Sequence, residues 1–158
     1  MFKRTLVTFD QAHRAIKRGN LASIRQALDA GVDANLSNKF SWTLLMLAGI
    51  EGNTGVGELL IKRGADPNKV NDGGETALSL AAHAGHVRFV ELLLDRGASP
   101  ECQPHGHSLA CWVTKTSGLS PKKIATILRI IAGHGAFAGD GAFNGRTRGP
   151  CPFCRTSS

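Results

Sequence analysis

The sequence is poor in aromatic residues and contains no tyrosine. Phe and Trp together make up 6% of the 158 residues, with two tryptophans among them. Proteins that bind single-stranded nucleic acids commonly stack bases on aromatic side chains, and here aromatic and basic residues alternate in one run only, residues 39–42. The formal net charge of +7 permits nucleic acid or an acidic surface as partner but requires neither, because the basic residues are scattered along the chain. We therefore expect nucleic acid to be an unfavoured partner.

Long apolar runs are also missing. No run approaches the roughly 18–20 residues that a membrane-spanning helix needs, so we expect no membrane association. The N-terminus begins with basic residues, as a signal peptide does, but its apolar stretch covers only residues 6–9 and ends at Asp10. The four cysteines suggest reduced thiols, because a stacked helical core needs no disulfides. These features predict a cytoplasmic location and leave open secretion into another cell.

What the sequence does contain is a constant period. The glycines at 19, 52, 85 and 118 are evenly spaced, since 52−19, 85−52 and 118−85 all equal 33. The glycines at 31, 64 and 97 show the same step. The clearest unit, residues 71–97, has a turn with paired glycines, an expected helix over 76–84, a Gly-His break and a second expected helix over 87–96. The break is too short for the helices to be anything but antiparallel neighbours, and a fixed period of this size indicates stacked repeats.

The repeating unit resembles the ankyrin repeat. Where that family usually has Thr-Pro-Leu-His-x-Ala, this unit has Thr76, Ala77, Leu78 and Ala81, followed by Gly85-His86 and by Arg96-Gly97-Ala98. The preceding unit matches in the same places, with Thr43, Leu45, Ala48, Gly52, Leu59, Leu60, Gly64, Ala65, Asp66 and Asn68. The resemblance covers about residues 9–136. It implies an all-α solenoid of stacked helix-turn-helix units joined by short β-hairpin-like turns.

We divide the chain into an N-terminal lead-in (1–8), a repeat domain (9–137) and a tail (138–158). The repeat units are expected at 9–36, 37–69, 70–102 and 103–137. The first unit lacks the hairpin and is more polar, as a cap facing water should be. The tail is rich in Gly, Arg and Ser without a periodic apolar face, and we expect it to be disordered.

At three places the sequence departs from the repeat pattern, and each departure leads to a prediction about local structure. Ser41 stands where the next unit has Gly74, which predicts a looser turn. Three glycines within residues 52–57 should fray the start of the following helix, leaving 58–63 as its dependable part. In the fourth unit we expect the first helix at 109–115 with its register shifted by one residue. The second helix there is expected at 121–132, with Ser120 as N-cap and Pro121 at the first helical position.

The resemblance implies a protein-binding site on the concave side, formed by hairpin tips and inner helices. The matched positions are Lys39, Phe40, Trp42, Ile50, Asp72, Glu75, His83, His105 and His107. Phe40 and Trp42 are the most informative, because the fold requires an aromatic residue at neither position and aromatic residues are typical of interface hot spots. The alternative is that Trp42 folds back on its own hairpin or on the first unit.

A second hypothesis is a zinc site. Cys102, His105, His107 and Cys111 lie within ten residues, and Cys151 and Cys154 form a CxxC motif. The spacing matches no standard zinc module, so we predict no metal and no cofactor. The CxxC motif lacks the flanking strand and helix of a thioredoxin-like site, and its role stays open.

We find no catalytic constellation and no glycine-rich phosphate loop after a strand, and we expect His86 to bond between neighbouring turns. The sequence therefore predicts a monomeric, non-enzymatic protein-protein interaction module without a small-molecule substrate. The alternative is an accessory protein that binds zinc or nucleic acid.

Overall fold

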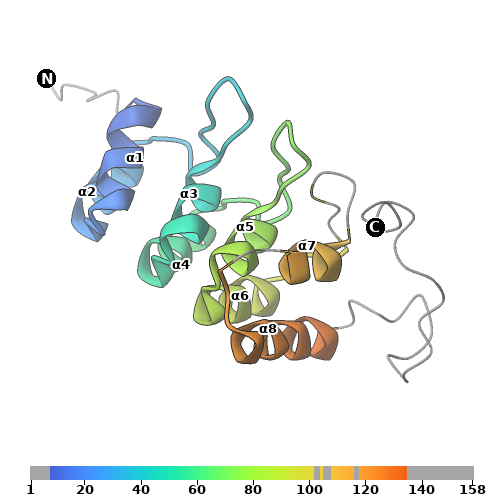
Figure 1. Cartoon of the computed structure of the whole chain (residues 1–158). Helices are drawn as coiled ribbons and strands as arrows, with labels where there is room; N and C mark the ends of the chain where they lie inside the picture. The colour runs from blue at the N-terminus through green and yellow to red at the C-terminus, as the bar shows by residue number, and fades with distance from the viewer. Residues whose placement is uncertain (1–7, 102–103, 105–107, 116–117, 135–158) are drawn as a thin grey trace, which may run out of the picture.

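The computed structural model describes residues 8–101, 104, 108–115 and 118–134. Within these residues the chain forms eight helices and one isolated antiparallel bridge, Ser37 to Thr43. The helices form four successive pairs: α1 (Phe9–Lys17) with α2 (Leu21–Asp29), α3 (Leu44–Glu51) with α4 (Thr54–Lys62), α5 (Ala77–Ala84) with α6 (Val87–Asp95), and α7 (Leu109–Lys115) with α8 (Pro121–Gly133). Figure 1 shows the pairs stacked along one axis, with two hairpin loops projecting before α3 and α5. The all-α repeat solenoid predicted from the sequence is confirmed.

The core runs through the stack along the inner helices. Helix α3 lies between α1 and α5 and buries six consecutive residues, Leu44, Leu45, Met46, Leu47, Ala48 and Gly49. Among the described elements, helix α1 has an inner-helix neighbour, α3, on one side only, and it buries Ala12 and Ile16 while Asp10, Gln11 and Arg14 are exposed. This contrast between a central helix that is apolar all round and an amphipathic end helix is expected for a stack whose first unit meets water.

The period of the sequence is explained by helix caps. The side chains of Thr43 and Thr76 each accept a hydrogen bond, 3.2 Å long, from the backbone N–H three residues later, which starts α3 and α5. The same helices end at Gly52 and Gly85, with φ of 70° and 77°. Glycine adopts this left-handed conformation at little cost. The second and third units therefore share both the signal that starts the inner helix and the signal that ends it.

The expectation that α4 begins late is wrong. The helix starts at Thr54 and includes Gly55 and Gly57 in its first turn. The reason is a contact with the next unit: a Cβ at Gly57 would lie 2.6 Å from the ring of Phe89, whose side chain is completely buried. Gly57 makes room for that ring, and the packing outweighs the low helix propensity of glycine.

The turn around Ser41 is not looser than its equivalent around Gly74. Ser41 adopts a φ of 62°, close to the 74° of Gly74, although non-glycine residues rarely occupy this region. The hydrogen bonds also match, because Ser41 N donates to Asn38 O at 3.1 Å and Gly74 N donates to Asn71 O at 2.9 Å. The Ser41 hydroxyl donates in addition to Asp72 Oδ1 at 2.7 Å. This bond to the next hairpin ties the two turns together.

In the fourth unit both expectations are confirmed. Ser108 caps α7 and stands one position short of a full period after Thr76, so the register is shifted by one. Ser120 caps α8, which begins with Pro121 and buries Ile127 and Ile131. The predicted lead-in (except Thr8) and the whole predicted tail, with Cys151 and Cys154, lie outside the described residues.

Polar ladders join successive units at the loops and on the outer helices. Asn35 Nδ2 donates to Gly64 O at 2.9 Å, and Asn68 Nδ2, one period later, donates to Gly97 O at 3.2 Å. Each asparagine also accepts from the next unit, Asn35 from Asp66 N and Asn68 from Ser99 N. These repeated hydrogen bonds within the chain fix the spacing between successive units.

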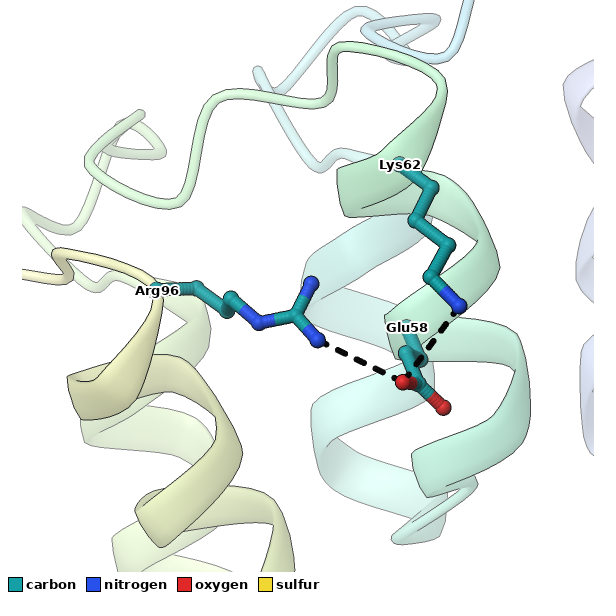
Figure 2. A network of polar contacts seen from close by, with 3 residues as sticks. All are labelled: Glu58, Lys62 and Arg96. Atoms are coloured by element: carbon teal, nitrogen blue, oxygen red, sulfur yellow. Dashed lines mark hydrogen bonds and ion pairs between the residues drawn. The ribbon is translucent and has the colours of Figure 1, made fainter.

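On the outer helices, the C-cap residue of each of α4, α6 and α8 pairs with an acidic residue of the outer helix in the preceding unit. The pairs are Arg63 with Asp29 at 2.6 Å, Arg96 with Glu58 at 3.3 Å, and His134 with Asp95 at 3.3 Å. Figure 2 shows the central pair, in which Glu58 also meets Lys62 of its own helix at 3.5 Å. None of the helices in the described residues is long and apolar enough to cross a bilayer.

Candidate partner-binding surface

A hollow of about 310 Å³ lies between the first helix, the first hairpin and α3. We call it the hairpin hollow and define it by its lining residues, Phe9, His13, Asn38, Phe40, Trp42, Leu47, Ile50 and Glu51. Stacking brings these residues together from three elements that are separate in the sequence: α1, the hairpin over 37–43, and α3. Figure 1 shows the first hairpin, which contributes Asn38, Phe40 and Trp42 to this lining, projecting from the stack before α3.

Phe40 stands at the tip of the hairpin and is 52% exposed. Its backbone is held by Asn38, whose Oδ1 accepts hydrogen bonds from Phe40 N at 2.9 Å and from Trp42 N at 3.0 Å. The Nζ of Lys39 lies 4.8 Å from the centre of the Phe40 ring, within the range of a cation–π contact. A large apolar ring is thus presented to solvent on a turn whose conformation is already fixed.

Trp42 does not share the exposure of Phe40. It is half-buried and packs against the core while lining the hollow beside Phe9 and His13 of α1. The Trp42 side chain is therefore not freely exposed, and it shares the hollow with residues of the first unit. Trp42 forms a wall of the hollow, and Phe40 forms its rim.

The hollow also contains residues that are not among the nine binding positions given above. Phe9 and His13 lie one turn apart on α1, with ring centres 6.4 Å apart, and Leu47 contributes from α3. The i, i+4 spacing of Phe9 and His13 places both on one helix face. That spacing was a usable signal, but only the stacking shows that this face meets the hairpin.

The candidates of the third unit lie beyond the hollow. Asp72 is exposed, and its Oδ1 accepts the hydroxyl of Ser41; its backbone N–H donates to Phe40 O at 3.4 Å. Glu75 Oε2 accepts from Asn71 Nδ2 at 2.7 Å within the second hairpin. His83 is exposed on α5 and stacks against Trp112 of α7, with ring centres 5.3 Å apart. Asp72 is therefore next to the first hairpin, while Glu75 and His83 belong to the neighbouring unit.

The zinc hypothesis involves four residues, of which one, Cys111, lies in the described part of the chain, half-buried in α7. Cys102, His105 and His107 fall outside it, so the structure does not place the two histidine candidates for partner binding either. In the described residues, no three His, Cys, Asp or Glu side chains lie close enough together to hold a metal ion.

The described histidines at the unit boundaries have structural contacts. His86 Nε2 donates to Ile50 O at 2.8 Å, as expected for a bond between neighbouring turns. Asn53, one period earlier, makes the corresponding bond to Ile16 O at 2.6 Å. The pKa of His134 is raised above its ordinary value of 6.5, first by the hydrogen bond to Ile130 O and then by the Asp95 side chain. The contacts of His86 and Asn53, and that of His134 with Asp95, join successive units of the stack.

The paired helices, the projecting hairpins and the repeated caps define a helical-repeat solenoid. Residues 12–104 match the family described as Ankyrin repeats (3 copies). Since the match covers more than half of the chain, this protein belongs to the ankyrin repeat family. No curated protein sequence matches the chain. Ankyrin repeats generally act as protein-protein interaction modules and are typically non-enzymatic. The match ends before α7, so the fourth helix pair lies beyond the three matched copies.

Proposed function

We propose that this chain is a non-enzymatic module, acting as a cytoplasmic monomer, that binds a partner protein on its concave side with the hairpin hollow as the main contact. The observation that carries the proposal is the exposed ring of Phe40 at the rim of an apolar hollow. Interface hot spots are enriched in aromatic residues and gather around pockets from which water is displaced. The position of Phe40 in the repeat demands no aromatic, since the next unit has Gly73 there.

Rigidity of the hairpin supports the same function. The Asn38 bonds fix Phe40 and Trp42, and the Ser41–Asp72 bond joins the first hairpin to the second. A surface that is ordered before binding loses less conformational entropy when a partner docks. The affinity of the hollow for a partner is therefore not reduced by a folding step.

The test is the substitution Phe40→Ala, because the ring is exposed and its removal leaves no internal cavity. We expect the melting temperature to stay within a few degrees and the affinity for the partner to fall by roughly 30-fold or more, the loss typical of a hot spot. The measurement is affinity capture from an extract of the source cell, followed by titration of the captured protein against both variants.

The matched control is Val70→Ser. Val70 is 57% exposed and occupies, on the second hairpin, the position of Ser37 on the first. The substitution removes a similar exposed apolar surface outside the hollow, so we expect partner capture to persist. Equal capture by wild type and Phe40→Ala would show that the hollow is not the binding site.

A further inference from the structure

The size and lining of the hairpin hollow indicate the chemistry of the partner that it would bind. This inference rests on the function proposed above. Its volume of about 310 Å³ is at the lower end of the roughly 300–1,000 Å³ of pockets that enclose small molecules. The walls formed by Phe9, Trp42, Leu47 and Ile50 are apolar, and Phe40 stands at the rim. A hollow of this size and lining suits one apolar side chain of a polypeptide.

The charged residue on the rim is Glu51. It is exposed and is the last residue of α3, where the negative end of the helix dipole disfavours a carboxylate. No ion pair joins it to another described residue. The repeat does not require an acid at this position either, because its equivalent in the next unit is Ala84. Glu51 is thus unfavourable at the end of its helix and, among the described residues, makes no ion pair at the edge of the apolar hollow.

A second carboxylate lies on the far side of the hairpin. Asp72 is exposed, and its backbone N–H contacts Phe40 O. The nearest basic residue at the tip, Lys39, already faces the Phe40 ring. A partner that places a cation beside its apolar anchor would meet Glu51 in the lining of the hollow and Asp72 beyond it, next to the hairpin.

We infer that the segment bound in the hairpin hollow is a peptide with an apolar anchor side chain flanked within a few residues by arginine or lysine. The anchor fills the hollow, and the cation pairs with Glu51. Arginine suits this rim better than lysine, because guanidinium groups bind carboxylates bidentately and stack on aromatic rings such as that of Phe40.

A library of random linear peptides displayed on phage tests the inference with the full chain as target. The peptides enriched on wild type should share an apolar residue close to Arg or Lys. A synthetic peptide of the enriched sequence should bind Glu51→Lys at least tenfold more weakly by fluorescence anisotropy. The same peptide with its Arg or Lys changed to Glu should prefer the Glu51→Lys variant to wild type.

Glu91→Lys is the control, since Glu91 is exposed on the outer helix α6 and gives the same change of net charge. We expect it to alter the affinity less than twofold; equal losses in both variants would mean that overall charge, not Glu51, selects the peptide. Enriched peptides without a basic residue, or no enrichment, would overturn the inference. If a captured partner protein still depends on Phe40 in that case, the proposed function stands and only the peptide chemistry falls; if binding is independent of Phe40, both fall.

Discussion

Gly57 is the residue at which helix propensity and packing oppose each other. Alanine in a helix interior is favoured over glycine by about 1 kcal/mol, but a Cβ at this position would lie 2.6 Å from the Cε2 and Cζ atoms of Phe89. Overpacking of this kind costs about 1–3 kcal/mol. The Phe89 ring is completely buried, so it cannot move aside into solvent.

We therefore predict that Gly57→Ala lowers the free energy of unfolding by up to about 2 kcal/mol, the difference between these two effects. Gly55→Ala on the same helix is the control, because its Cβ would meet Leu21 Cδ2 at an ordinary 3.9 Å. That substitution should raise the free energy of unfolding by up to about 1 kcal/mol. Urea titration followed by circular dichroism measures both, and a gain of stability in both variants would show that the Phe89 contact is not tight.

The contact of His134 with Asp95 links helix α8 to α6, and we expect its strength to depend on pH. The folded-state pKa of His134 is raised above its ordinary 6.5 by the Ile130 carbonyl and by Asp95. The stabilisation is therefore fully present below the unfolded-state pKa and is lost as pH rises through the higher folded-state value. The His134 side chain is 37% exposed, so screening by solvent limits the effect to a few tenths of a kcal/mol.

The substitution His134→Gln tests this pH dependence, since glutamine can keep hydrogen bonds but not the charge. We expect wild type to be more stable than the variant at pH 5.5 and the difference to disappear at pH 8.5. The other histidines are present in both proteins, so their titration cancels in the comparison. A difference of the same size at both pH values would mean that the ion pair does not contribute.

Most of the elements were predictable from the sequence because their signals are local. Thr43 and Gly52 mark the ends of α3 within the same stretch of chain, and Ser120 with Pro121 marks the start of α8. The start of α4 was mispredicted because its cause, the ring of Phe89, comes from another unit. The geometry of the Ser41 turn was mispredicted for the same kind of reason, since Asp72 of the next hairpin holds it.

The binding surface was also predictable where its signal is local, and it was not predictable where it depends on contacts between units. The repeat register alone pointed to Phe40, Trp42 and Ile50, and all three line the hairpin hollow. The register does not show which face of α1 meets the hairpin, so only the stacking shows that Phe9 and His13 line the hollow. It also does not distinguish the exposed Phe40 from the half-buried Trp42, because that depends on what the first unit covers.

At the scale of the whole molecule, the two tryptophans report on different ends of the stack. Trp42 packs against the core in the second unit, and Trp112 stacks on His83 from the fourth. Phe89 lies between them, with its ring against Gly49 of α3 and Gly57 of α4. A substitution at Phe89 therefore weakens the interface that separates the two reporters.

Phe89→Leu should lower the free energy of unfolding by roughly 1–2 kcal/mol, less than the about 3–5 kcal/mol of a Phe-to-Ala truncation. Either side of this interface contains two repeat units, fewer than the roughly three that a stack needs to be stable alone. Neither half should persist once the interface opens, so both tryptophans should report one shared, lower urea midpoint. The measurement is fluorescence of Phe89→Leu in Trp42→Phe and Trp112→Phe backgrounds, each compared with the same single-tryptophan protein carrying Phe89. Two separated midpoints would contradict this account, because they would show that half of the stack folds without the other.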